Sequence, residues 1–185
     1  MAEYIWSDLH LGHTNIIRYC NRPFKDTEAM DKALLKAWRE TVTGSDTIIN
    51  LGDFCFKWTK ERTESVVKNL PGYKILILGN HDRHHSLDWW RSVGFDEVYP
   101  YPIIYKQWYI LSHEEVFLNE KIPYLNIHGH RHNVKLSPKC YINVSVECTN
   151  YKPVALDTLL ASPPEISEEE KWVPVKTGLE KETYE

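Results

Sequence analysis

The sequence predicts an α/β domain in which two mixed β-sheets pack face to face and helices flank them. Two observations point to this fold. In the first half of the chain, short apolar runs alternate with helix-like segments, and parallel strands need long crossovers of this kind. In the second half, apolar runs follow one another after short turns, which is typical of a partly antiparallel sheet. We expect one domain over residues 1–160 of the 185-residue chain.

Five short apolar runs are rich in β-prone residues and are expected to be strands. These runs are residues 4–7, 47–51, 74–78, 108–111 and 124–127. Each run is followed directly by polar residues. The predicted strands therefore deliver polar side chains at their carboxyl ends.

Helices are expected between the first three strands, because residues 27–41 and 59–70 carry apolar side chains at helical spacing. A further helix is expected over residues 87–93. The apolar runs at 98–105 and 140–146 are expected to belong to the second sheet. Together these elements complete the predicted sandwich.

The last segment, residues 161–185, differs in composition from the rest of the chain. It has little apolar periodicity and contains Glu168, Glu169 and Glu170 in succession. We expect an acidic C-terminal tail that is solvated or loosely attached. An acidic docking segment is the alternative interpretation.

Composition argues against several classes of protein. No apolar run approaches the about 20 residues of a membrane-spanning helix, and the N-terminus has no signal-peptide pattern, so we expect a soluble, cytoplasmic protein without a membrane partner. The four cysteines have no CxxC spacing, so neither a disulfide nor a thiolate zinc site is expected. A net charge of −4 argues against a stable complex with nucleic acid, because such complexes depend on many Lys and Arg contacts.

Histidine is abundant, with nine residues that fall mostly in short clusters, and clustered histidines suggest a metal site. Asp8 and His10 are two positions apart, as are His130 and His132. Each pair therefore points to one side of an extended segment. Carboxylate, amide and imidazole groups without sulfur suit borderline-hard divalent ions. The sequence thus predicts a site for a pair of divalent ions at the ends of the strands.

Five polar motifs follow the predicted strands in order: Asp8-Leu9-His10, Gly52-Asp53, Gly79-Asn80-His81-Asp82, His113 and Gly129-His130-Arg131-His132. Taken together, these motifs resemble the calcineurin-like metallophosphoesterase superfamily, whose pattern is DxH, GD, GNH followed by D or E, then H, then GHxH. The resemblance spans residues 4–155 and includes features of the small, cap-less bacterial and phage-type members. It implies a four-layer αββα fold.

The resemblance also implies a role for each motif residue. Asp8, His10 and His132 would hold a first ion, Asn80, His113 and His130 a second, and Asp53 would bridge both. A hydroxide that bridges the two ions would attack phosphorus. His81 would protonate the leaving alkoxide without binding metal, and Asp82 would orient the His81 ring.

Departures from well-known relatives narrow the expected substrate. Protein phosphatases of the superfamily extend GD to GDxVDRG, whereas Asp53 here precedes Phe-Cys-Phe-Lys-Trp, so their phosphate-binding arginine is absent. The chain also leaves no room for the capping domain of the DNA-repair nucleases. We expect a phosphodiesterase or phosphatase that acts on a nucleotide or another small ester. The alternatives are an endonuclease for single-stranded nucleic acid and a non-catalytic, metal-bound scaffold.

The ligand types also indicate which metal the site would hold. Mn²⁺ is the expected ion, and Fe, Zn²⁺ and Ni²⁺ suit the same ligands. His13 and Arg83 lie beside the motifs and are expected to contact the substrate, with a solvated or supporting role as the alternative. Trp58 is expected to be exposed and to cover a substrate base. The sequence leaves open the oligomeric state and the choice between monoester and diester.

Overall fold

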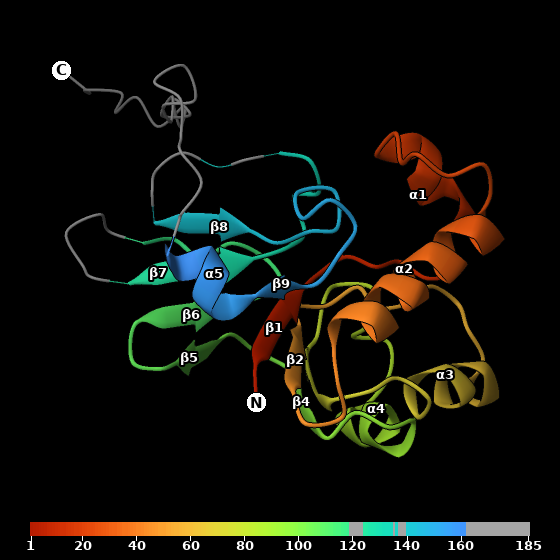
Figure 1. The fold of residues 1–185 in the computed structure, drawn as a ribbon, viewed down its shortest axis with the longest axis horizontal. Helices are drawn as coiled ribbons and strands as arrows, with labels where there is room; N and C mark the ends of the chain where they lie inside the picture. Colours follow the sequence, from red (N-terminus) through yellow and green to blue (C-terminus); the bar gives the residue numbers. More distant parts are fainter. Residues whose placement is uncertain (119–123, 135, 137–139, 162–185) are drawn as a thin grey trace, which may run out of the picture.

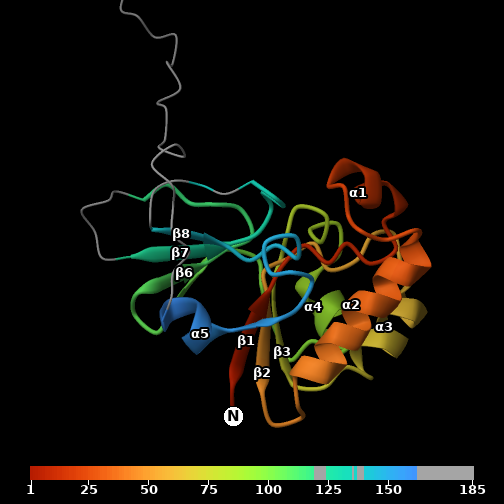
Figure 2. The same ribbon diagram turned by 45° about the horizontal axis from the view of Figure 1, so that its top comes forward.

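The structure is a computed structural model that describes residues 1–118, 124–134, 136 and 140–161. Two β-sheets pack against each other, and helices α2, α3 and α4 lie on the outer side of the first sheet (Figures 1 and 2). The predicted α/β fold with two mixed sheets and flanking helices is confirmed. The predicted acidic tail lies outside the described residues, except for Ala161.

The first sheet has five strands in the order β4-β3-β2-β1-β9. They are β1 (Glu3–Trp6), β2 (Thr47–Asn50), β3 (Tyr73–Ile77), β4 (Glu97–Tyr99) and β9 (Val154–Ala155). Strands β1 to β4 run parallel, whereas β9 pairs antiparallel with β1. Because parallel strands end at the same edge of a sheet, the loops after β1, β2 and β3 emerge together.

The second sheet has four strands in the order β5-β6-β7-β8. They are β5 (Ile103–Tyr105), β6 (Tyr109–Leu111), β7 (Leu125–His128) and β8 (Tyr141–Asn143). The β5–β6 pair is antiparallel, and the β6–β7 and β7–β8 pairs are parallel. The sheet is therefore mixed, and β6 and β7 also end at one edge.

Residues 98–105, expected as one run of the second sheet, are divided between the two sheets. β4 adds to the first sheet beside β3, whereas β5 begins the second sheet. Pro100 and Pro102 lie between these strands. Proline has no backbone N–H to donate, so it interrupts strand pairing. The chain passes from one sheet to the other at this break.

The three predicted helices begin at capping side chains. They are α2 (Thr27–Thr41), α3 (Lys60–Val67) and α4 (Leu87–Ser92). Asp26, Thr59 and Ser86 each accept a hydrogen bond from a backbone N–H three residues further on. Two six-residue helices, α1 (Thr14–Tyr19) and α5 (Leu156–Ala161), were not expected, because such short segments carry little periodic signal. None of these helices is long and apolar enough to cross a bilayer.

Two apolar cores of different composition hold the layers together. The core between the helices and the first sheet contains large aromatic side chains, among them the fully buried Trp6, Trp38, Phe54 and Trp90. The core between the sheets is mainly aliphatic, with residues such as Ile5, Ile49, Leu111, Ile127 and Val144. Branched aliphatic side chains pack well between pleated surfaces. This second core brings the two sheets together, and with them the edges at which five strands end.

Candidate metal centre

The loops after β1, β2, β3, β6 and β7 meet where the two sheets adjoin. The backbone joins the sheets there, because Ser7 after β1 forms a parallel bridge with Ser145 after β8. The backbone N–H of Val146 donates to the carbonyl of Ser7 at 3.1 Å. The residues after each strand therefore face a common space.

Asp53 lies between histidines from different loops. Its Oδ2 atom is 3.4 Å from Nε2 of His10 and 3.4 Å from Nε2 of His113. Nε2 of His10 is also 3.9 Å from Oδ1 of Asp8. One carboxylate thus faces both sides of the cluster, which is the position that a bridging ligand needs.

The remaining predicted ligands complete two neighbouring groups. Oδ1 of Asn80 is 3.0 Å from Nε2 of His113 and 3.1 Å from Nδ1 of His130. On the other side, donor atoms of Asp8, His10 and His132 lie within 4.8 Å of one another. The structure therefore brings together all seven side chains that the sequence predicted as metal ligands.

Five of these seven residues have a positive φ angle, which is uncommon for residues other than glycine. They are Asp8 (60°), His10 (51°), Asp53 (53°), His130 (64°) and His132 (49°). Such conformations cost energy and persist where the surrounding structure enforces them, most often at functional sites. The loops that form the cluster thus carry part of the backbone strain of the described residues.

The motif glycines allow the loops to approach closely. A Cβ atom on Gly79 would overlap the carboxylate of Asp53, and a Cβ on Gly129 would overlap Ser7 and the carboxylate of Asp8. Any larger residue at either position would push a carboxylate away from the cluster. Close packing explains why glycine precedes Asn80 and His130.

The cluster fits divalent cations by its donor atoms and by its unsatisfied polar groups. In the described part of the chain, Oδ1 of Asp8 and Nε2 of His10 are buried without a hydrogen-bond partner. A buried polar atom without a partner costs about 1–3 kcal/mol, and a cation would satisfy both of these atoms. Oxygen and imidazole donors without sulfur suit borderline-hard divalent ions.

The protonation states differ across the cluster. Burial holds the pKa of His10 well below its usual value, so this ring is neutral and able to donate a lone pair. Burial also acts to lower the pKa of His113, but its hydrogen bond with Asp53 and the nearby carboxylate charges outweigh burial and raise it to about 9. Burial acts to raise the pKa of Asp53, but the hydrogen bond and the charge of His113 outweigh burial and hold it well below its usual range.

Nδ1 of His113 lies 2.7 Å from the backbone carbonyl of Leu51, which leaves Nε2 directed at Asp53. Nδ1 of His132 lies 3.2 Å from Oε1 of Glu147. A contact of this kind at one ring nitrogen sets the orientation of the other nitrogen toward a metal. Both rings are therefore positioned by groups outside the cluster.

Asp82 has partners other than the predicted one. It is fully buried, and its carboxylate accepts hydrogen bonds from the backbone N–H groups of Asp53 (2.6 Å), Gly79 (2.9 Å) and Phe54 (3.2 Å). Burial and the neighbouring charge of Asp53 raise the pKa of Asp82 to about 7. In the structure the carboxylate of Asp82 clamps the Asp53 loop to the Gly79 loop, and an orienting role toward the His81 ring stays a prediction.

His81, the predicted proton donor, lies at the rim of the cluster and is partly exposed. Its backbone N–H donates to Oδ1 of Asp53 at 2.9 Å, and its ring centroid is 5.3 Å from that of His10. A donor atom of His81 also lies within 4.8 Å of His10 and Asp53 donor atoms. The geometry therefore permits His81 to act beside the metals or as one of their ligands.

Sequence reasoning missed a buried ion pair behind the first group. Arg22 donates to the carbonyls of Asp8 (2.7 Å) and Leu9 (2.9 Å), and its guanidinium lies 2.8 Å from Oε1 of Glu147. Glu147 in turn contacts His132. A lone arginine between two predicted elements carries no sequence signal for this role. Glu147 ends the segment Asn143-Val144-Ser145-Val146-Glu147, which resembles the small, cap-less members, but sequence reasoning gave Glu147 no role.

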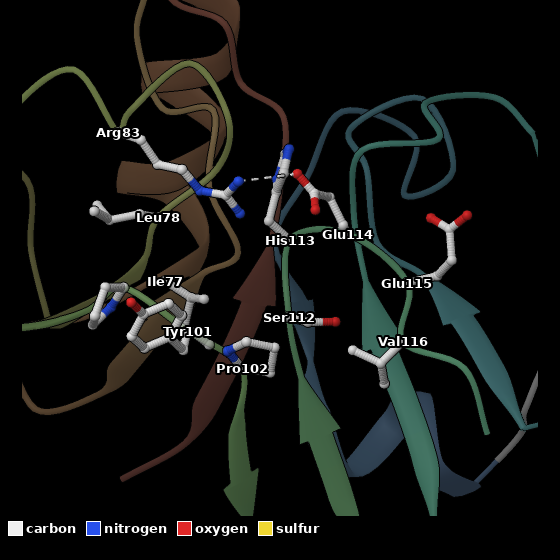
Figure 3. Close-up of a pocket in the computed structure, with 11 residues that line it drawn as sticks. Ile77, Leu78, Arg83, Tyr101, Pro102, Ser112, His113, Glu114, Glu115 and Val116 are labelled. Atoms are coloured by element: carbon white, nitrogen blue, oxygen red, sulfur yellow. Dashed lines mark ion pairs between the residues drawn. The ribbon is translucent and has the colours of Figure 1, made fainter.

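His13 and Arg83 lie on opposite sides of the cluster. The ring centroid of His13 is 5.5 Å from that of His10 and 4.1 Å from that of Phe56. Nη1 of Arg83 lies 3.3 Å from Oε1 of Glu114, and Figure 3 shows this pair beside His113. The predicted contacts of both residues with a substrate stay predictions.

The expectation of an exposed Trp58 is wrong. Only 8% of this residue is exposed, and its indole packs against Gly12, where a Cβ atom would overlap the ring nitrogen. The guanidinium of Arg62 lies 4.3 Å from the ring centroid. Trp58 is therefore buried against Gly12, and it also lines a hollow between residues 12–15 and 56–58.

Comparison with known proteins identifies relatives of this chain. A family model for calcineurin-like phosphoesterases matches residues 4–177. An uncharacterized protein of Methanocaldococcus jannaschii is 34% identical over 168 residues, which make up 85% of this chain and 88% of that protein. The Gene 66 protein of Mycobacterium phage L5 is 30% identical over 138 residues, covering 74% of this chain and 62% of that protein.

A solved structure is also similar. The crystal structure of a protein of unknown function from Aquifex aeolicus matches with a TM-score of 0.66 and 28% identity, over 86% of this chain and 98% of that chain. The matched family model and the Asp and His clusters together suggest metal-dependent hydrolysis of phosphoesters. The chain belongs to the calcineurin-like phosphoesterase family.

Proposed function

We propose that this protein hydrolyses the phosphate ester of a small molecule, such as a nucleotide, with two divalent ions held at the ends of five strands. The observation that carries the proposal is the position of Asp53, 3.4 Å from both His10 and His113. Two-metal hydrolases hold their ions about 3.5–4 Å apart and need a ligand between them. Membership of the phosphoesterase family supports the same reaction.

Each group of the chain has a proposed task. Two ions would supply positive charge to the phosphoryl oxygens and lower the pKa of a shared water. Asp8, His10 and His132 would hold one ion, Asn80, His113 and His130 the other, and Asp53 both. In hydrolysis the water oxygen bonds to phosphorus and the bond to the leaving oxygen breaks. His81 gives its ring proton to that leaving oxygen.

We propose Mn²⁺ as the ion, with Fe, Zn²⁺ and Ni²⁺ as alternatives that the same ligands accept. The proposed partner is a small phosphate ester and not a nucleic acid held in a stable complex, because the net charge of −4 does not favour many phosphate contacts. His13 and Arg83 are the proposed contacts to the substrate.

Elemental analysis of the purified protein, followed by assays with bis(p-nitrophenyl) phosphate and p-nitrophenyl phosphate, tests the proposal. We expect about two divalent ions per chain and turnover that stops on chelation and returns with added metal. Preference between the two esters decides between diesterase and monoesterase. A metal-loaded protein that cleaves no ester would instead be a scaffold, and cleavage confined to single-stranded DNA or RNA would indicate an endonuclease.

A further inference from the structure

A hollow of about 320 Å³ lies beside His13, between the loops of residues 12–15 and 56–58. Arg62 of α3 also lines it. Sites for small organic ligands in proteins usually measure about 300–1,000 Å³. The hollow is therefore large enough for an organic group attached to a phosphate at the metal centre.

The opposite side of the centre offers much less space. The hollow beside His113 measures about 90 Å³ and is lined in part by Glu114 and Glu115 (Figure 3). Their carboxylates would repel an anionic leaving group and offset the charges of the nearby arginines, Arg83 with Glu114 and Arg131 with Glu115. The proposed contact of Arg83 is therefore with the reacting phosphate and not with the leaving group. The larger volume of the His13 hollow and the negative charge beside His113 both favour the His13 side for the organic part of a substrate.

The proposed proton donor also lies on the His13 side. The ring centroid of His81 is 5.6 Å from that of Phe56 and 6.2 Å from that of His13, and both of these rings line the larger hollow. A general acid must lie beside the oxygen that leaves. The group attached to the leaving oxygen therefore extends into the larger hollow.

The lining of this hollow combines rings with a cation that has no carboxylate partner among the residues that the structure describes. Phe56 and His13 present ring surfaces, and Nδ1 of His13 has no hydrogen-bond partner in the described part of the chain. The ammonium of Lys57 lies 5.1 Å from the Phe56 ring and forms no ion pair among the described residues. Arg62, in contrast, lies 3.4 Å from Asp31.

We infer that this hollow binds the leaving group of the substrate, and that this leaving group is a nucleoside carrying a further phosphate. The inference rests on the proposed function. A planar base packs against the rings of Phe56 and His13, and the second phosphate pairs with Lys57. Water adds to the bridging phosphorus, the bond to the nucleoside oxygen breaks, and His81 protonates that oxygen. The substrate class is therefore a short nucleotide phosphodiester.

The test compares three thymidine dinucleotides, TpT, pTpT and TpTp, with the full-length, metal-loaded protein. Chromatography measures cleavage of the internal diester. One of the two phosphorylated forms is expected to have a kcat/KM about two- to fivefold that of TpT, as one exposed ion pair would produce. Lys57→Gln is expected to bring this ratio close to one, whereas Lys57→Arg keeps it. Lys25→Gln, which alters an exposed lysine outside the hollow, is the matched control and leaves the ratio unchanged.

The outcomes separate this inference from the proposed function. Absence of any turnover of bis(p-nitrophenyl) phosphate would overturn the proposed function itself. Turnover of that ester with equal kcat/KM for the three dinucleotides would overturn only the assignment of the leaving group. A preference for a phosphorylated dinucleotide that survives Lys57→Gln would also overturn it, because the phosphate would then bind elsewhere.

Discussion

The two halves of the proposed metal centre are held in place by different means. The first-sheet half consists of Asp8, His10, Asp53 and Asn80, and the second-sheet half of His113, His130 and His132. In the first-sheet half, the buried carboxylate of Asp82 joins the Asp53 loop to the Gly79 loop through backbone N–H groups. Parallel neighbouring strands carry the ligands of both halves, so the Asp82 contacts are what distinguishes the first-sheet half.

The second-sheet half depends on groups from other parts of the chain. His113 is directed by the carbonyl of Leu51, and His132 by the carboxylate of Glu147. His132 is also more exposed, with 22% of its side chain accessible against 2% for His10. The comparison teaches that a buried carboxylate ties the loops of the first sheet into a fixed frame, whereas His113 and His132 are each oriented by a group that is not a predicted ligand.

The largest effect is expected from Asp53→Asn, because Asp53 joins the two halves. The change removes the negative charge between His10 and His113, so kcat/KM is expected to fall at least about 10³-fold, with fewer than two ions bound per chain. Activity assays with elemental analysis measure both quantities. Asp88→Asn, at a side chain that is 93% exposed, is the control and keeps both. Two bound ions and full turnover in Asp53→Asn would refute a bridging role.

The second-largest effect is expected from a change at His81, the proposed proton donor, which lies in a loop of the first sheet. His81→Asn is expected to lower kcat by about 10²-fold or more, since a general acid contributes at least that much, while metal content stays the same. Loss of an ion from the variant would instead make His81 a ligand, as its closeness to His10 and Asp53 permits.

Metal binding is expected to depend on pH through the second-sheet half. The raised pKa of His113, about 9, and that of His132, about 10, mean that the metal-free protein holds these protons at neutral pH. For His132, hydrogen bonds with Cys20 and Glu147 outweigh the lowering effect of burial. Metal must displace the protons, so apparent affinity rises with pH, about tenfold per unit for each proton, up to these pKa values.

Titration calorimetry in buffers of different ionisation enthalpy measures this proton release at neutral pH. His10 adds none, because its pKa is already low. An affinity that does not change between pH 6 and 8 would show that the two halves do not differ in this way.

The smallest effect is expected from Asp82→Asn, which tests the rigid frame directly. An asparagine keeps one acceptor oxygen and turns an amide N–H toward backbone donors. The free energy of unfolding of the metal-free protein is expected to fall by about 1–3 kcal/mol, the cost of buried donors left without partners. Urea unfolding measures this change. An unchanged midpoint would mean that the strands alone hold the frame.

Much of the fold could be predicted because its signals are local. Helix α2 has the predicted bounds, since Asp26 caps it and apolar residues recur at helical spacing. The strand ends were recognisable because an apolar run stops at polar residues. The seven ligand candidates follow from these ends, and their convergence agrees with the geometry that the motifs imply.

Other features depend on contacts that leave no local signal. Arg22 and Glu147 are 125 positions apart, and neither residue type has a pattern that points to the other. The division of residues 98–105 between two sheets also required knowledge of which strand lies beside β3. The sequence suggested Asp82 as a partner for the adjacent His81. In the structure, the buried carboxylate of Asp82 accepts hydrogen bonds from backbone N–H groups of two other loop segments.

By itself, the sequence determined the order of the three longer helices and of most strands, and the identity of the chemical groups at the strand ends, because periodicity and capping act over a few residues. Only the tertiary structure decided which groups stand behind the ligands and which side of the centre has room for an organic leaving group. These features arise where the edges of two sheets meet, so they depend on residues that are distant in the chain and adjacent in space.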